Sequence, residues 1–546
     1  MTLDELTLIN SFVLLLAAFS FPFGYYMYQV LERVPGPRFK SWFTSMNWKQ
    51  YGVAFIAAHG IAFVIPFCIL AFQHVLPMNP DGQKALSADL LYNTVTSFWT
   101  NTNLQHYSGE SSLSYLSQLF GLMYLQFFTP AAGLAALAAI SRLLWGKVEI
   151  GNFYLDMIRI LAYILLPMSV ILSLFLTYQG VPMSLEGAAQ VTTLEGAPQT
   201  IARGPAALFI AIKQLGTNGG GFFGTNSAHP MENPTALSNL LENGAILLIP
   251  MACVWFFAFQ IRRLKHGAVI FSIMLLLFFI KVNAATYLES NPSPGLAGLP
   301  VTQVDANLEG KEMRLGPTAG AFWAVSTTST SNGSVAAMHD SLNPLTGLLP
   351  LIGMWLSVVF GGVGVGMINI LLYVFVAVFI GGLMVGRTPE YLNRKLEIRE
   401  VKLAMLALLL HPFLILLGTA LFLATGVAQE TILNQGAHGL SEVLYEFSSA
   451  SANNGSGFEG LGDNTVAWNI ATGLAMFLGR FIPILLPLAI AGSLAAKDPT
   501  TETQGTLRTD GFSFAALLLF TIILVGALLF LPAAILGPVQ EALLTL

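Results

Sequence analysis

The chain has 546 residues, of which 55% are hydrophobic and only 10% charged, and its formal net charge is −5. Soluble domains usually carry charges on about a quarter of their residues, so this composition excludes an ordinary soluble protein and indicates a polytopic membrane protein. The weakly acidic balance also excludes a basic face for nucleic acid. Cys68 and Cys253 both lie in apolar stretches, where we expect small core side chains and no disulfide.

The sequence carries no motif for nucleotide or structural-metal chemistry. The phosphate-binding pattern Gly-x-x-x-x-Gly-Lys-Ser/Thr is absent, and the eight histidines and two cysteines show neither His-x-x-x-His nor Cys-x-x-Cys spacing. We therefore expect that this chain binds no nucleotide and has no catalytic residue of its own.

Apolar stretches long enough to span a bilayer occur ten times along the chain. They cover about 6–31, 50–76, 116–141, 157–178, 236–260, 267–288, 345–385, 402–426, 466–495 and 513–536. Asp4 and Glu5 precede the first stretch in place of a basic segment, so we expect a retained span and not a signal peptide. The seventh contains a Gly-rich run at 361–366 and is expected to break there. The predicted fold class is an all-α membrane protein with ten transmembrane helices.

The basic residues define the orientation of these spans. Of the 24 lysines and arginines, 17 fall on one set of alternating loops or beside them. They are Arg33, Arg38, Lys40, Lys49, Arg142, Lys147, Arg159, Arg262, Arg263, Lys265, Arg387, Arg394, Lys395, Arg399, Lys402, Lys497 and Arg508. Because cytoplasmic loops are enriched in Lys and Arg, we assign these loops to the cytoplasm and both termini to the outside.

The outside connections are long and acidic. Their acidic residues include Asp81, Asp89, Glu186, Glu195, Asp305, Glu309 and Glu312. Most are expected to be ordinary solvated side chains, although a net acidic mouth also raises the local concentration of cations.

Each long outside connection ends in the same pattern: a short helix, a polar loop around an asparagine, and the next span. The loops lie at 100–105, 217–222, 331–335 and 453–458. An alignment on the asparagines Asn101, Asn218, Asn332 and Asn454 sets Thr102 opposite Gly219, Gly333 and Gly455. This register predicts a pseudo-fourfold repeat of helix, re-entrant pore helix with filter loop, and helix.

The predicted repeat divides the whole chain. The divisions are 1–40 for an N-terminal flanking helix, 41–145, 146–262, 263–395 and 396–498 for repeats one to four, and 499–546 for a C-terminal flanking helix.

Four such loops around one axis would line a pore with backbone carbonyl groups. Carbonyl oxygens can replace the water shell of a monovalent cation, and their number and field strength favour K⁺ over Na⁺. A single Gly-rich loop is most simply a tight turn, but four in register favour a selectivity filter. Because Thr102 interrupts the symmetry, we expect one selective site in place of a row of equal sites.

Several segments resemble a known family. They are the loops above together with 386–392 (Gly-Arg-Thr-Pro-Glu-Tyr-Leu), 477–481 (Phe-Leu-Gly-Arg-Phe), 107–110, 226–230 and 441–445. From the first span to the last, the chain resembles the potassium-binding A subunit of the bacterial Kdp potassium-transporting P-type ATPase, a member of the superfamily of K⁺ transporters. The chain lacks the Asp-Lys-Thr-Gly-Thr phosphorylation motif of the ATPase subunit, so the resemblance is to the ion-binding part.

The resemblance implies a function, partners and site residues. K⁺ from outside would be selected in the filter and passed through an intramembrane tunnel to a P-type ATPase B subunit, in a complex with a C subunit and a small F subunit in the bacterial inner membrane. Filter roles would fall on Asn101, Thr102, Asn103, Gln105, Asn218, Gly219, Gly220, Asn332, Gly333, Ser334, Asn454, Gly455 and Ser456. A gating loop would contain Gly361, Gly362, Gly364 and Gly366. Ser357 stands where relatives are expected to carry a carboxylate, which puts a carboxylate on the tunnel route in doubt.

Charges within the spans have structural and functional interpretations. Arg480 is either paired with an acceptor in the bundle or a fixed charge that stops K⁺ from leaking straight through. Lys281 is expected to snorkel to the interface, and Asp156 with Arg159 to form a helix pair. His106, His229 and His339 follow three of the loops and are expected to make structural hydrogen bonds in preference to binding metal.

Two other functions remain open from the residues alone. One is a stand-alone Trk- or Ktr-like potassium channel or symporter, which shares the fourfold plan. The other is a non-conducting scaffold that only stabilises a pump.

Overall fold

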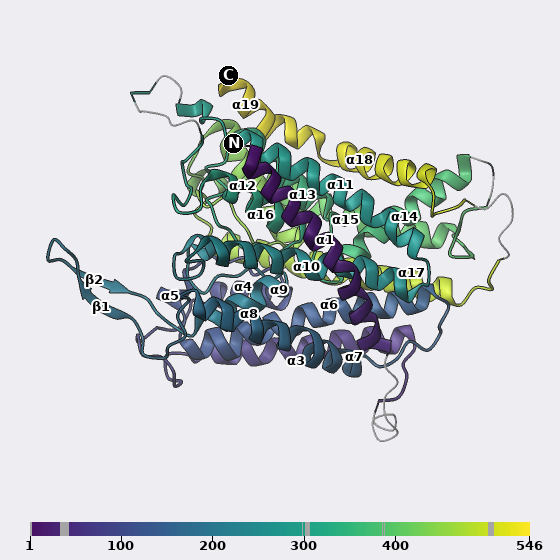
Figure 1. The fold of residues 1–546 in the computed structure, drawn as a ribbon, viewed down its shortest axis with the longest axis horizontal. Coiled ribbons are helices and arrows are strands. Elements are labelled where there is room, and N and C mark those ends of the chain that lie inside the picture. Colours follow the sequence, from purple (N-terminus) through teal and green to yellow (C-terminus); the bar gives the residue numbers. More distant parts are fainter. Residues whose placement is uncertain are drawn as a thin grey trace.

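The computed structural model describes residues 3–32, 43–296, 299–300, 306–384, 386, 388–500 and 507–545. Four basic residues used above for orientation, Arg33, Arg38, Lys40 and Arg387, and the acidic Asp305 lie outside these ranges. Within them the chain is almost entirely helical (Figure 1).

Ten of the described helices are long and apolar enough to cross a membrane, as predicted. They are built from α1 (Leu3–Glu32), α3 (Trp48–Ala71), α6 (Met123–Leu144), α7 and α8 (Phe153–Ile160 and Leu166–Tyr178), α10 (Ala236–Gln260), α11 (Leu264–Glu289), α14 (Val365–Met384), α15 (Ile398–Ala424), α17 (Val466–Ala495) and α18 (Phe512–Ala534). One π-helical turn precedes α6 and another joins α7 to α8. The helices run side by side along the long axis of the molecule (Figure 1).

The predicted seventh span is two helices. An apolar helix, α13 (Pro344–Leu356), ends well before α14 begins, and the residues between them have no regular structure. The predicted break is therefore confirmed, although it begins a few residues earlier than the Gly-rich run.

Four shorter helices precede the four predicted loops. They are α4 (Ala88–Trp99), α9 (Ala206–Leu215), α12 (Pro317–Ser329) and α16 (Gly436–Ala452). The remaining elements are α5 (Gly109–Ser112), α19 (Gln540–Thr545) and two small antiparallel hairpins, β1–β2 (Ala189–Thr192 and Pro198–Ile201) and β3–β4 (Glu390–Tyr391 and Arg394–Lys395).

Local sequence explains where several helices begin. Asn47 caps α3 and Thr235 caps α10 through a capping box in which the third helical residue bonds back to the cap. Proline occupies the first turn of α12 and α13, where its missing N–H costs no hydrogen bond.

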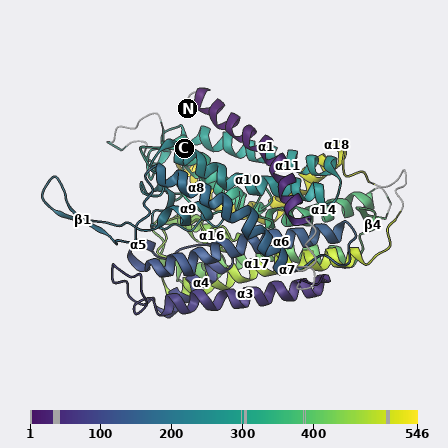
Figure 2. The same cartoon turned by 60° about the horizontal axis from the view of Figure 1, so that its bottom comes forward.

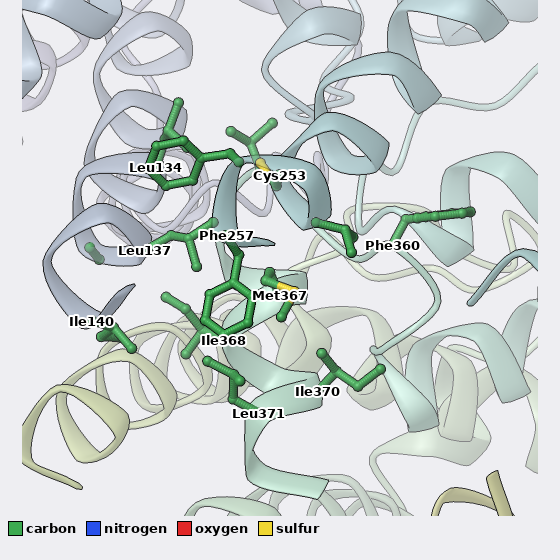
Figure 3. Close-up of a cluster of buried hydrophobic side chains, with 14 of the residues drawn as sticks. Leu134, Leu137, Ile140, Cys253, Phe257, Phe360, Met367, Ile368, Ile370 and Leu371 are labelled. Carbon is green, nitrogen blue, oxygen red and sulfur yellow. The ribbon is translucent and has the colours of Figure 1, made fainter. Parts of the chain in front are cut away.

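The core lies where α6, α10 and α14 meet, and these are the most buried of the ten long helices. Figure 3 shows the side chains that fill this contact, including Leu137 of α6, Phe257 of α10 and Ile368 of α14. Outer helices such as α1, α3 and α18 instead expose large apolar side chains, as surfaces that face lipid do. α1 lies against α10, where Gly24 packs so closely on Trp255 that a Cβ would come within 2.6 Å of its side chain.

Both termini lie at the end of the molecule that carries the β1–β2 hairpin, whereas β3–β4 lies at the opposite end (Figures 1 and 2). The two termini therefore lie on the same side of any membrane that the ten helices cross.

Candidate functional site

The four short helices α4, α9, α12 and α16 lead into loops with one common backbone geometry. In each loop, one N–H group donates to the carbonyl oxygen five residues earlier, near the end of the helix. These bonds join Thr102 to Ser97 (2.9 Å), Asn218 to Lys213 (2.8 Å), Asn332 to Thr327 (2.9 Å) and Asn454 to Ser449 (2.9 Å). The residues on both sides of each donor have positive φ: Asn101 and Asn103, Thr217 and Gly219, Ser331 and Gly333, Asn453 and Gly455.

This geometry corrects the predicted alignment of the first loop by one residue. Thr102, and not Asn101, is equivalent to Asn218, Asn332 and Asn454. Asn103 therefore stands opposite the three glycines and adopts φ of 56° with a side chain present. Asparagine is among the few non-glycine residues that tolerate this left-handed conformation. The departure from fourfold symmetry is real, but it lies at Asn103 and not at Thr102.

The loops pack directly on one another. A Cβ added at Gly219 would lie 1.9 Å from the carbonyl oxygen of Asn332, and one at Gly333 would lie 2.1 Å from that of Asn454. The same holds for Gly455 and the carbonyl oxygen of Thr102, at 2.1 Å. At three of the four contacts between neighbouring loops there is therefore no room for a side chain at the glycine position.

The remaining interface, between the first and second loops, is held by a side chain. Asn101 Nδ2 donates to the carbonyl oxygen of Thr217 at 2.7 Å. Together with the three glycine contacts, this bond closes the four loops into a ring.

Side chains of the predicted filter residues fix the backbone of the ring. Ser334 Oγ donates to Asn332 Oδ1 (2.5 Å), and Ser456 Oγ donates to Asn454 Oδ1 (2.6 Å). The amide nitrogens of the two asparagines then each donate, at 3.0 Å, to the carbonyl oxygen of a residue in the preceding repeat's short helix. These serines and asparagines are buried, so their side chains stabilise the loop backbone through hydrogen bonds inside the protein.

Gln105 of the first loop stabilises the second loop through two hydrogen bonds. Its Oε1 accepts from the Gly221 N–H (2.7 Å), and its Nε2 donates to the Gly221 carbonyl oxygen (3.1 Å). Gly220 lies in the same contact, because a Cβ there would meet the Asn103 side chain at 2.9 Å. Both predicted site residues therefore lie between loops one and two.

A buried ion pair that was not predicted from the sequence supports the second loop. Lys213 of α9 and Glu232 are both fully buried and in direct contact. Lys213 Nζ also donates to Asn226 Oδ1 (2.7 Å), and Asn226 Nδ2 donates to the Gly219 carbonyl oxygen (2.7 Å). A lysine inside an otherwise apolar helix was the available signal, since buried charges are costly without a partner.

The third repeat has a comparable pair, and another joins the first repeat to the fourth. Lys311 Nζ lies 3.1 Å from Glu289 Oε2, and His106 Nε2 lies 3.2 Å from Glu446 Oε1, all in buried positions. Burial lowers the pKa of His106, but the carboxylates of Asp463 and Glu446 outweigh it and raise the pKa to about 9.

The segment between α13 and α14 lies against the ring. The Gly361 N–H donates to the carbonyl oxygen of Ser329 at the end of α12 (2.9 Å), and the Val363 N–H donates to Thr217 Oγ1 (3.0 Å). Gly361 and Gly364 have positive φ, and a Cβ at Gly366 would lie 1.9 Å from the Phe360 carbonyl oxygen. Positive φ or close backbone packing thus explains why Gly361, Gly364 and Gly366 are glycines. The fourth predicted gating-loop glycine, Gly362, lies opposite Ser331 and Thr217.

A cavity of about 60 Å³ lies between the ring and the long helices. Its lining includes Asn101, Ser331 and Asn453, which occupy equivalent positions in loops one, three and four, together with Ser357, Gly362, His411 and Arg480. Arg480 is buried, and its Nη2 donates to the Thr129 carbonyl oxygen (3.1 Å). Within the described part of the chain no carboxylate pairs with Arg480, and its Nε has no hydrogen-bond partner.

Two predictions about charged side chains were wrong. Lys281 does not reach an interface but is buried, and its Nζ donates to Ser329 Oγ (2.5 Å). Asp156 pairs with Arg142 (2.6 Å) and not with Arg159, which donates to the Leu31 carbonyl oxygen instead. In both cases the actual partner comes from a segment distant in the sequence: Ser329 for Lys281, and Arg142 for Asp156.

The three histidines that follow the loops all make hydrogen bonds, as predicted. His229 Nδ1 accepts from the Met231 N–H (3.1 Å), and the Nδ1 of His339 bonds the Tyr445 hydroxyl group (2.8 Å). His106 bonds Asn469 Oδ1 (2.7 Å) as well as Glu446. Cys68 and Cys253 are free thiols, as expected, but only Cys253 is a buried core side chain, and the core position expected for Cys68 was wrong because it is exposed on α3.

The fold resembles that of a solved potassium transporter. The crystal structure of TrkH from Vibrio parahaemolyticus matches with a TM-score of 0.54, over 89% of this chain and 98% of that chain. At 16% identity, this likeness concerns the fold alone. Together with the ten apolar helices, it defines a multi-pass membrane protein of the potassium-transporter fold.

Sequence comparison gives the family. A family model described as potassium-transporting ATPase A subunit matches residues 11–543. The potassium-binding subunit of a potassium-transporting ATPase from Caldanaerobacter subterraneus subsp. tengcongensis is 45% identical over 539 residues, covering 96% of both chains. The chain belongs to the potassium-transporting ATPase A subunit family, and it is a membrane protein of potassium transport.

Proposed function

We propose that the ring formed by the four loops binds and selects K⁺ from the outside. The chain is the ion-binding, non-catalytic subunit of an ATP-driven importer, and K⁺ is its cargo. One observation carries this proposal: four loops repeat the same alternation of positive and negative φ, with the central N–H bonded back to a short helix. The carbonyl groups of Thr102, Asn218, Asn332 and Asn454 are then left to face the axis and replace the ion's water shell.

The helices support the same assignment. Each of α4, α9, α12 and α16 ends immediately before its loop, so its partly negative C-terminal end is directed at the ring. These four helices are the proposed re-entrant pore helices, and the repeats 41–145, 146–262, 263–395 and 396–498 each contribute one. A cation in the ring is stabilised by all four.

We further propose that the ring has one dominant K⁺ site. Asn103 fills a position that is glycine in the other loops, so the first interface cannot repeat the packing of the remaining three. Unequal loops give unequal coordination along the axis, which suits tight binding better than fast permeation.

The segment of residues 357–364 and Arg480 are proposed to block straight passage. The segment is bonded to Thr217 and Ser329 beneath two loops, and Arg480 places a cation in the cavity below the ring. A K⁺ ion that leaves the ring then meets positive charge and is diverted sideways, into an intramembrane tunnel that leads to the partner. Ser357 lines the same cavity, so the tunnel entrance carries a hydroxyl group in place of the expected carboxylate.

The partners follow from the family. The Caldanaerobacter relative is named as a subunit of a potassium-transporting ATPase. We therefore propose that this chain works with a P-type ATPase B subunit, a C subunit and a small F subunit in the bacterial inner membrane, with both termini outside. A nucleotide would be bound by the B subunit and not by this chain.

The test is K⁺-stimulated ATPase activity of the co-purified complex. Gly219→Asp inserts a side chain where only 1.9 Å separates a Cβ from the Asn332 carbonyl oxygen, so we expect the half-saturating K⁺ concentration to rise strongly. Gly511→Asp is the matched control, because that glycine has nothing within 4 Å and an extended backbone. An unchanged K⁺ dependence in Gly219→Asp would remove the ring from the mechanism.

A further inference from the structure

Three side chains with metal-binding groups meet just outside the ring. His106 follows the first loop, Glu446 belongs to α16, and Asp463 follows the fourth loop. His106 Nε2 lies 3.2 Å from Glu446 Oε1 and 3.8 Å from Asp463 Oδ2, and the three ligand atoms all lie within 4.8 Å of one another. His106 and Glu446 are buried, whereas the Asp463 side chain is 27% exposed and opens the cluster to solvent.

The hydrogen bonds around His106 settle which ring nitrogen faces the carboxylates. Asn469 Nδ2 donates to Asp89 Oδ2 (2.8 Å) and to Asn464 Oδ1 (3.2 Å), so Asn469 Oδ1 must be an acceptor. That oxygen lies 2.7 Å from His106 Nδ1, which therefore carries the hydrogen. When Nε2 carries no proton, its lone pair faces two carboxylate oxygens. Three acceptors at this distance need a cation between them, either a proton or a metal ion.

We propose that His106, Glu446 and Asp463 form a binding site for a divalent transition-metal ion of the zinc class. Zinc takes histidine nitrogen and carboxylate oxygen at about 2.0–2.2 Å, which sets ligand atoms of a tetrahedral site roughly 3.2–3.6 Å apart. The distances of 3.2 and 3.8 Å from Nε2 match this with little movement. A histidine ligand selects this class over Mg²⁺ and Ca²⁺, and Asn469 is the outer-shell partner that a metal-bound histidine requires.

A second cluster of histidine and carboxylate side chains differs from the cluster at His106 in its hydrogen bonds. Asp340, His438 and Glu442 are also close together, but both nitrogens of His438 are already bonded, to Asp340 Oδ1 (2.9 Å) and Glu541 Oε1 (2.8 Å). Both oxygens of Glu442 accept from the backbone N–H groups of Leu433 and Asn434. Glu442 is thus committed to backbone donors and His438 to a carboxylate outside the cluster, which makes the cluster at His106 the better candidate among the described residues.

A bound metal would join the outer end of the first loop to the helix of the fourth repeat. The site stands on its own geometry and does not depend on K⁺ binding in the ring. Its fourth ligand would be a water molecule on the exposed Asp463 side, so metal can enter and leave without unfolding the loops.

The test is a titration of the purified complex with Co²⁺, followed by its visible absorption, and then with Zn²⁺, followed by displacement of Co²⁺. We expect one Co²⁺ per chain in the wild type, and a loss of affinity of at least about tenfold in Asp463→Asn and in Glu446→Gln. The matched control His438→Gln should bind like the wild type. Asp463→Asn alters the partly exposed ligand, and its K⁺-stimulated ATPase activity reports whether it is folded. Absence of stoichiometric binding in the wild type, or equal binding by folded Asp463→Asn, would show that the cluster holds only a proton and would overturn the proposal.

Discussion

Gly333 shows how tightly single residues constrain the ring. Its φ is 93°, and a Cβ would lie 2.1 Å from the Asn454 carbonyl oxygen. We expect Gly333→Ala to weaken the apparent K⁺ affinity of the complex about tenfold or more, since a non-glycine residue in such a conformation costs about 1–3 kcal/mol before any clash is counted. Asn103→Gly, which gives the first loop the residue of the others, should leave the complex assembled. K⁺ titrations of ATPase activity measure both, and full affinity in Gly333→Ala would contradict the packing argument.

Arg480 carries a second prediction at the residue scale. Its guanidinium group is buried beside the cavity and bonds only a carbonyl oxygen among the described residues. Arg480→Ala should therefore raise passive K⁺ flux through the complex in proteoliposomes without ATP, whereas Arg480→Lys should restore the barrier. If K⁺ uptake and K⁺ leak are both unchanged in Arg480→Ala, the guanidinium group is not the barrier and Arg480 only contributes to packing.

The register of the first loop shows where sequence reasoning stops at this scale. Asn101 and Asn103 flank Thr102, so either asparagine can be aligned with Asn218. Only the sign of φ and the hydrogen bond from Thr102 to Ser97 distinguish the two choices, and neither is visible in residue types. The buried pairs Lys213–Glu232 and Lys311–Glu289 were missed for a related reason, because their partners come from separate segments.

At the scale of elements, the segment of residues 357–364 is held to the ring by few bonds. Thr217→Val removes the hydroxyl group that accepts from the Val363 N–H while keeping the shape of the side chain. We expect this change to loosen the segment and to increase ⁸⁶Rb⁺ leak in proteoliposomes, with K⁺ affinity little altered. A ⁸⁶Rb⁺ leak at the wild-type level together with a large loss of K⁺ affinity would contradict the proposed role of this segment.

The C-terminal helix α19 is tied to α16 and to the third repeat through His438. Burial alone lowers the pKa of His438, but the carboxylates of Asp340 and Glu541 raise it to about 10. A raised pKa means that the ion pairs stabilise the fold fully below the ordinary histidine pKa of about 6.5. This stabilisation is lost as the pH rises through about 10. Glu442 also faces this cluster.

We therefore expect the melting temperature of the wild type to fall as the pH is raised from neutral towards 10, and to fall less in His438→Gln. Differential scanning fluorimetry of the purified complex measures both. Parallel curves for the two proteins would show that His438 does not link α19 to the rest of the fold.

The elements themselves were the most predictable feature. The bounds of α10 and α17 agree with the predicted spans 236–260 and 466–495, because length and apolar composition alone mark a bilayer-spanning helix. The seventh span was harder: α13 and α14 are both apolar, and only the glycines indicated that they are separate. How the short helices converge on one ring depends on tertiary packing, which local patterns do not carry.

For the whole molecule, the account requires a partner that supplies energy. The chain expressed alone should show no robust K⁺ uptake in a K⁺-requiring host, and co-expression with the P-type ATPase subunit should restore it. Robust flux through the chain alone would favour a stand-alone Trk- or Ktr-like channel. The family match over residues 11–543 favours the complex.

The central claim is that the carbonyl groups of Thr102, Asn218, Asn332 and Asn454 hold K⁺. Anomalous scattering from Tl⁺, which substitutes for K⁺, locates the ion directly in crystals of the complex. The account predicts one dominant peak enclosed by these four carbonyl groups, and its loss in Gly219→Asp. Several equally occupied peaks along the axis would contradict the single selective site, and absence of any peak within the ring would contradict the filter itself.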